Sequence, residues 1–81
     1  MNPSYGAFEG WLISRLASLS AVDPEWMDID RAFVDYSLDS SVAVTLAEEL
    51  SREVGRSLSP TLFWEHPNIR ALASALAAAA P

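Results

Sequence analysis

The chain has 81 residues, with 11 acidic side chains, five arginines, no lysine and one histidine, and its formal net charge is −6. This length allows a single domain, the absence of cysteine excludes disulfides and thiolate metal sites, and a negative charge without lysine argues against a nucleic-acid partner. Because no apolar run reaches the ~20 residues of a membrane-spanning helix and the N-terminus lacks a signal-peptide pattern, we expect a cytoplasmic domain with no membrane partner.

The first predicted helix begins after Pro3-Ser4 and ends near Ser20. Ser4 has the side chain of a helix N-cap, and proline is common at helix starts. Apolar residues then recur at spacings of three and four, which is the pattern of one face of an amphipathic helix. These residues are Phe8, Leu12, Leu16 and Leu19, with Trp11 beside them.

Residues 21–38 show no regular period and are predicted to form a long loop. Asp23-Pro24 can start a short turn of helix, with Asp as the cap and Pro at the first position. We expect Ile29, Phe33 and Tyr36 to anchor the loop on the helices. Loops of this length in compact domains are often functional.

The strongest helical pattern covers residues 40–54. Asp39 precedes it as a candidate N-cap, and Gly55 follows as a candidate C-cap. Val44 lies off the apolar stripe, on the outer side of the helix. The stripe itself consists of Ala43, Leu46, Ala47, Leu50 and Val54.

Two further helices are predicted after Gly55. Ser59-Pro60 starts a short one, and residues 66–68 end it and start the last helix, whose apolar face begins at Ile69 and ends at Leu76. No segment alternates as a strand would. We expect an all-α fold of four helices in one domain, residues 1–81, with a folded core at about residues 4–76 and an alanine-rich linker starting in residues 77–81.

The sequence offers no convincing catalytic or metal site. A calcium loop starting at Asp28 would need an oxygen ligand at its fifth position and glycine at its sixth, where the chain has Ala32 and Phe33. Ser40, His66 and an aspartate would provide the residue types of a catalytic triad. A helical bundle of this size has little room for a substrate pocket, so we expect a non-catalytic protein with no metal.

Ser40 is the residue best placed for chemistry. It follows the cap Asp39, so it should be exposed at the first position of the helix. The N-terminus of a helix presents free N–H groups and the positive end of the helix dipole, and both favour a phosphate ester on the hydroxyl.

The same residues resemble the attachment motif of acyl carrier proteins, which bind phosphopantetheine. The motif reads Ser37-Leu38-Asp39-Ser40, with Leu46 six residues after the serine. The resemblance extends over nearly the whole chain, and His66-Pro67 followed by Ile69 and Leu72 is typical of polyketide-synthase carrier domains. It implies a four-helix bundle of the acyl-carrier type with a long loop between the first two helices and a short third helix.

Two positions depart from the family pattern. Ser37 stands where glycine is common, and Ser41 stands where a large apolar residue usually follows the attachment serine. Choosing Ser41 as the attachment site would shift the register by one residue and turn the apolar stripe by about 100°. The register therefore favours Ser40.

The resemblance implies a function and a set of partners. A phosphopantetheinyl transferase would attach phosphopantetheine to Ser40, and the arm would carry acyl groups as thioesters between an acyltransferase or acyl-activating ligase, a ketosynthase and other domains of a polyketide or hybrid synthase. The domain itself would be monomeric. The residues expected to face these partners are Asp39, Ser41, Val44, Thr45 and Glu48.

Two alternatives stay open at this point. One is a peptidyl carrier domain of a nonribosomal peptide synthetase, although that class more often has Gly-Gly-His-Ser or Gly-Gly-Asp-Ser at the motif, where this chain has Ser37-Leu38-Asp39-Ser40. The other is a helical docking or interaction module that has kept the fold without the arm.

Overall fold

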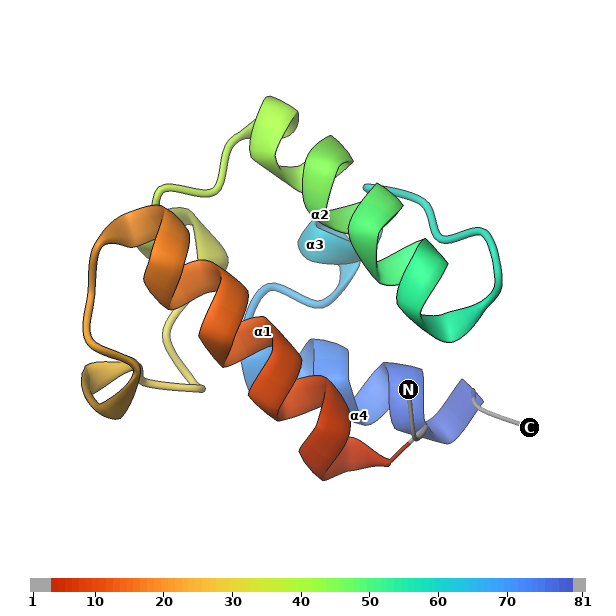
Figure 1. Ribbon diagram of the computed structural model, residues 1–81, viewed down its shortest axis with the longest axis horizontal. Coiled ribbons are helices and arrows are strands. Elements are labelled where there is room, and N and C mark those ends of the chain that lie inside the picture. Colours follow the sequence, from red (N-terminus) through yellow and green to blue (C-terminus); the bar gives the residue numbers. More distant parts are fainter. Residues whose placement is uncertain (1–3, 80–81) are drawn as a thin grey trace.

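A computed structural model of the protein describes residues 4–79. Within this range it contains four α-helices and two short 3-10 helices, and no strand is formed apart from an isolated antiparallel bridge between Ala32 and Asn68 (Figure 1). The elements are α1 (Tyr5–Ser20), η1 (Pro24–Trp26), η2 (Phe33–Tyr36), α2 (Ser40–Val54), α3 (Leu62–Glu65) and α4 (Ile69–Ala79). The predicted all-α fold, with its long first loop and short third helix, is therefore confirmed.

Capping hydrogen bonds fix the start of α1 and the end of α2 at the residues that the sequence predicts. The Ser4 hydroxyl accepts a hydrogen bond from the Ala7 N–H at 3.2 Å, which satisfies one of the free donors of the first turn of α1. Gly55 ends α2 in the left-handed conformation with φ of 75°, and its N–H donates to the Ser51 carbonyl at 2.9 Å. Glycine adopts this conformation without a steric penalty.

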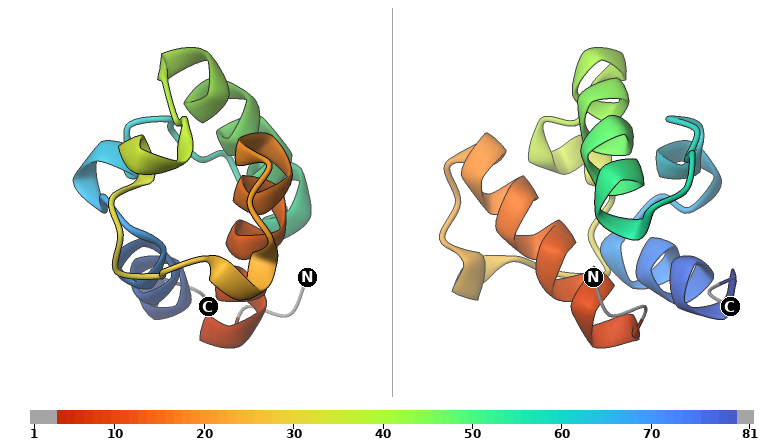
Figure 2. Two further views of the ribbon diagram at one scale, coloured as in Figure 1. Left: turned by 90° about the vertical axis from the view of Figure 1, so that its left-hand side faces the viewer. Right: turned by 45° about the vertical axis from the view of Figure 1, so that its right-hand side comes forward.

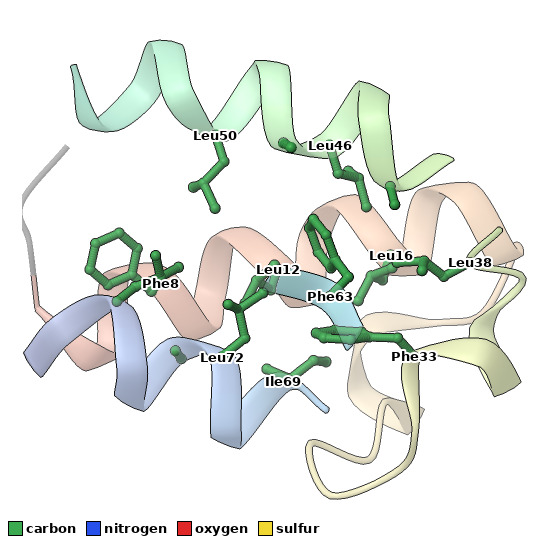
Figure 3. Packing of buried hydrophobic residues seen from close by; sticks show 14 residues of the cluster. Phe8, Leu12, Leu16, Phe33, Leu38, Leu46, Leu50, Phe63, Ile69 and Leu72 are labelled. Carbon is green, nitrogen blue, oxygen red and sulfur yellow. The ribbon is translucent and has the colours of Figure 1, made fainter. Parts of the chain in front are cut away.

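The core lies between α1, α2 and α4, and the loop residues close one end of it (Figure 3). Phe33 from η2 and Phe63 from α3 meet edge to face, with ring centroids 5.3 Å apart, an arrangement that aromatic pairs prefer. Phe63 is buried whereas its neighbour Trp64 is half exposed, so α3 buries one ring only. The core comprises Phe8, Leu12, Leu16, Phe33, Leu38, Ala43, Leu46, Ala47, Leu50, Phe63, Ile69, Leu72, Ala73 and Leu76.

The long loop is fixed to the start of α4 by backbone hydrogen bonds. The Phe33 N–H donates to the Pro67 carbonyl at 2.7 Å, and the Arg70 N–H donates to the Ile29 carbonyl at 3.0 Å. Phe33 and Tyr36 are buried and Ile29 is partly buried, so all three anchor the loop as predicted. The loop, which runs from α1 to the start of α2 (Figure 2), is therefore held in a defined position against α4.

The sequence predicts Leu19 as part of the buried face of the first helix. In the structure its side chain is 47% exposed. It lies in the last turn of α1. This end of the helix diverges from α4 (Figure 1), so α4 does not cover it as it covers the other end of the helix.

The third helix begins later than Ser59-Pro60 indicated. Its N-cap is Thr61, and the turn before it is closed by bonds from the Leu62 N–H to the Ser59 carbonyl and from the Phe63 N–H to the Pro60 carbonyl. These bonds span three residues, as in a 3-10 turn. The helical hydrogen-bond pattern therefore becomes regular only at Leu62.

The last helix extends further than expected. It continues to Ala79, three residues past Leu76, and Ala77 is partly buried against the core. Alanine is the best helix former, which explains why the alanine run stays helical. The expected linker start therefore overlaps helical residues at 77–79, while residues 80 and 81 lie outside the described part.

Candidate functional site

Ser40 is the first residue of α2, and its side chain is exposed. The preceding residue, Asp39, is the N-cap with extended backbone angles, and its Oδ1 accepts a hydrogen bond from the Val42 N–H at 2.9 Å. The Asp39 carbonyl accepts from the Ala43 N–H at the same distance. Asp39 therefore sets where the helix starts, and this places the Ser40 hydroxyl at the positive end of a 15-residue helix.

The two residues before Asp39 hold the start of α2 in place. The Leu38 side chain is buried in the core, so it fixes the chain just before the helix. Ser37 adopts a left-handed conformation with φ of 63° and ψ of 23°. Such angles favour glycine, the residue that the motif of the resembled family leads us to expect at this position.

The other predicted site residues share the outer surface of α2. Asp39, Ser41, Val44, Thr45 and Glu48 are all exposed, and the exposed fraction of Val44 is 43%. Positions 40, 44 and 48 form one row at a spacing of four, and positions 41 and 45 form the next. The two rows are adjacent on the helix and together form the surface beside Ser40. Within the second row, the Thr45 hydroxyl donates to the Ser41 carbonyl at 3.1 Å.

A hollow of about 150 Å³ lies on the other side of Ser41, between the C-terminal end of α1 and the start of α2. Sequence reasoning missed this hollow, because it assigned Leu19 to the core and gave Arg15 no role. Arg15 also joins the two helices: its Nη2 lies 2.5 and 2.7 Å from the two carboxylate oxygens of Glu49. The residues that line the hollow are Arg15, Leu19, Ser41, Val42, Thr45 and Leu46.

His66 has a structural position. It ends α3, and its N–H donates to the Leu62 carbonyl at 2.9 Å. In residues 4–79, no group of three or more metal-ligating side chains could hold a metal ion. None of the helices in this range has the length and apolar character needed to cross a membrane.

The exposed serine at the capped start of α2 agrees with the sequence comparisons. The family model described as "Phosphopantetheine attachment site" matches residues 10–76. The chain belongs to this family. Its members are non-catalytic carrier domains that hold phosphopantetheine covalently, and residues 10–76 include the whole of α2 and most of α1 and α4.

The carrier domain is similar to segments of large polyketide synthases. It is 45% identical over 71 residues to a phenolphthiocerol/phthiocerol polyketide synthase of Mycobacterium tuberculosis, and the match covers 88% of this chain and 4% of that protein. It is 40% identical over 77 residues to polyketide synthase PksM of Bacillus subtilis, covering 95% and 2% respectively. The chain thus spans only a small part of the length of these relatives.

Solved carrier proteins share the fold. An acyl carrier protein of Anabaena with a variant phosphopantetheinylation-site sequence superposes with a TM-score of 0.90 at 32% identity, covering 100% of this chain and 92% of that one. A free-standing peptidyl carrier protein from Acinetobacter baumannii gives 0.86 at 34% identity, covering 95% and 96%. These likenesses confirm the four-helix architecture of the acyl-carrier type.

The residues of the carrier domain fit the family's cofactor. An exposed hydroxyl can form a phosphodiester without rearrangement of the core, and the first turn of a helix offers N–H groups and a favourable dipole to its phosphate. When bound, phosphopantetheine supplies a thiol that can hold an acyl group. The chain contains no cysteine, so it has no thiol of its own.

Proposed function

We propose that Ser40 carries the phosphopantetheine arm and that the domain is an acyl carrier of a polyketide or hybrid synthase. The observation that carries this proposal is the placement of Ser40, exposed and directly after the Asp39 cap, at the start of α2. Ser41 is exposed as well. However, Ser40 alone follows the Asp residue and keeps Leu46 at its family position.

Within this proposal, each residue near Ser40 has a definable task. The buried Leu38 and the cap Asp39 fix the start of α2, so the hydroxyl is held at a constant place on the surface. The Asp39 carboxylate is engaged by the Val42 N–H at 2.9 Å. The remaining N–H groups at the helix start are then available to the phosphate.

The outer surface of α2 is the proposed contact area for partners. Val44 is an exposed aliphatic side chain between Ser40 and the acid Glu48, and a small apolar contact with charges around it suits a transient interface. A net charge of −6 favours partners with basic surfaces. We infer that a phosphopantetheinyl transferase, an acyltransferase or acyl-activating ligase and a ketosynthase use this surface.

The polyketide role is supported by the synthases that resemble this chain at 40–45% identity. A covalent arm raises the effective concentration of its acyl group at each nearby catalytic domain. The acyl group would be held as a thioester. The cytoplasmic location expected from the sequence stays a prediction.

A peptidyl carrier is the second candidate, because a solved protein of that class has a TM-score of 0.86 and 34% identity to this chain. The two candidates differ in the catalytic domain that accepts the cargo. A polyketide carrier passes an acyl group to a ketosynthase, whereas a peptidyl carrier passes an aminoacyl group to a condensation domain.

A transfer assay separates these functions. The domain is first converted to its phosphopantetheine form, and its intact mass is checked. It is then loaded from acyl- or aminoacyl-coenzyme A and mixed with a polyketide ketosynthase or a nonribosomal condensation domain. Acyl transfer to the ketosynthase alone is the expected result. Transfer only to the condensation domain would favour the peptidyl carrier, and a folded domain that cannot be loaded would indicate an unmodified docking module.

A further inference from the structure

The hollow between α1 and α2 begins one residue from the proposed attachment site. Ser41 lines it and directly follows Ser40. Three aliphatic side chains, Leu19, Val42 and Leu46, supply its apolar lining, and the hydroxyl residues Ser41 and Thr45 complete the side formed by α2. A ligand for this hollow should therefore be compact and apolar, with a polar group beside the apolar part.

Leu19 indicates that the hollow is incompletely filled. It is 47% exposed, although the other aliphatic residues on the same face of α1, Leu12 and Leu16, are fully buried. Apolar area that stays in contact with water is a source of binding free energy, since its burial is favourable. A compact apolar group seated on the exposed area of Leu19 and Val42 would gain this contribution.

Arg15 provides a polar partner at the same place. Its Nη2 is occupied by Glu49, at 2.5 Å from one carboxylate oxygen. The Arg15 side chain is 41% exposed as a whole. Its guanidinium therefore offers charged N–H donors at the edge of the hollow, where an oxygen atom of a ligand can accept from them.

We propose that this hollow binds the pantoyl segment of the arm on Ser40. The pantoyl segment is the first part of the arm after the phosphate, and it carries two methyl groups on one carbon next to a hydroxyl and an amide carbonyl. The methyl groups match the Leu19, Val42 and Leu46 lining, and an oxygen of the segment accepts from the exposed part of the Arg15 guanidinium. This inference rests on Ser40 as the attachment site.

The position of the hollow favours the pantoyl segment over the acyl group. The thiol that carries the cargo is at the far end of the arm, whereas the hollow starts at the residue next to the attachment serine. An arm seated there lies on the α1 side of α2. The outer row that contains Val44 and Glu48 is then left free for partners.

Nuclear magnetic resonance of the arm-bearing domain tests the proposal. Methyl spectra are recorded for the domain without the arm, with the arm, and with a butyryl group on the arm, after intact mass has confirmed complete modification of each loaded sample. We expect nuclear Overhauser contacts between the pantoyl methyls and the methyls of Leu19, Val42 and Leu46, in both arm-bearing forms. Contacts confined to Val44 or Trp64, contacts made only by the butyryl chain, or no contacts at all would overturn the proposal.

Matched variants sharpen this test. Leu19→Ala removes part of the lining at a half-exposed position, and Arg15→Gln removes the guanidinium beside it. Both variants should lose the pantoyl contacts while still accepting the arm. Val34→Ala is the control, because Val34 is 63% exposed and does not line the hollow; it should keep them. Contacts unchanged in Leu19→Ala and Arg15→Gln would contradict the assignment, whereas a wild type that gains no mass would instead refute attachment itself.

Discussion

Asp30 and Arg70 are 40 positions apart in the chain and form a two-bonded ion pair, with Arg70 Nε 2.6 Å from Asp30 Oδ1 and Arg70 Nη2 3.1 Å from Oδ2. The pair joins the long loop to the first turn of α4. The backbone bond from the Arg70 N–H to the Ile29 carbonyl lies beside it. The loop that leads to Ser40 is thus held by both side-chain and main-chain contacts.

This ion pair predicts a pH dependence of stability. The hydrogen bond and the charge of Arg70 lower the pKa of Asp30 below its usual value. Because the folded-state pKa is the lower one, the stabilisation is fully present above the unfolded-state pKa of ~3.9 and is lost as the pH falls through the folded-state value. In denaturant unfolding, the stability difference between wild type and Asp30→Asn should shrink as the pH falls below about 4. A difference that stays constant from pH 7 to pH 2 would contradict this account.

The Asp39 cap should contribute measurably to stability. Replacing an N-cap side chain by alanine costs about 1 kcal/mol, whereas asparagine is an equally good cap. We therefore expect Asp39→Ala to lower the free energy of unfolding by about that amount and Asp39→Asn to lower it little. Equal losses in both variants would mean that the charge of Asp39, and not its bond to the Val42 N–H, stabilises α2.

Ser37 offers a stabilising substitution. A left-handed conformation costs a residue with a Cβ about 1–2 kcal/mol, and glycine avoids this cost but adds roughly 0.5–1 kcal/mol of unfolded-state entropy. Ser37→Gly should therefore stabilise the domain by about 0.5 kcal/mol, and Ser37→Val should destabilise it. Thermal and denaturant unfolding measure both changes, and a stabilising Ser37→Val would contradict the assigned backbone conformation.

Val44 and Glu48 should affect transfer and not folding. Val44→Glu changes an exposed apolar contact, and Glu48→Lys reverses a charge on the same surface. If each removes about 1 kcal/mol of partner binding, kcat/KM for acyl transfer falls about fivefold, while circular dichroism spectra and unfolding curves stay close to wild type. Unchanged transfer in both variants would exclude this surface of α2 from the interface. Val34→Ala, an exposed position in η2, serves as a control outside α2.

The helices and the candidate serine were predictable because their signals are local. The spacing of Leu46 and Leu50 follows from the helical period, and the capping role of Asp39 depends on residues only three and four positions away. Ser40 therefore had a defined position before any long-range contact was known.

The features that the sequence did not reveal depend on distant contacts. The exposure of Leu19 reflects how α1 diverges from α4, and the bonds of Arg15 to Glu49 and of Arg70 to Asp30 join residues 34 and 40 positions apart. Ser37, whose backbone is left-handed, likewise stands between two residues with buried side chains, Tyr36 and Leu38. Periodicity and capping rules carry no information on such contacts.

The identity of the modified residue is the central claim, and intact mass after enzymatic modification tests it most directly. Wild type, Ser40→Ala and Ser41→Ala are each incubated with coenzyme A, magnesium and a broad-specificity phosphopantetheinyl transferase. Both variants change exposed side chains, and circular dichroism verifies that they fold. We predict a gain of one phosphopantetheinyl group in wild type and Ser41→Ala and no gain in Ser40→Ala. A gain that persists in Ser40→Ala and is lost in Ser41→Ala would contradict the assignment of Ser40.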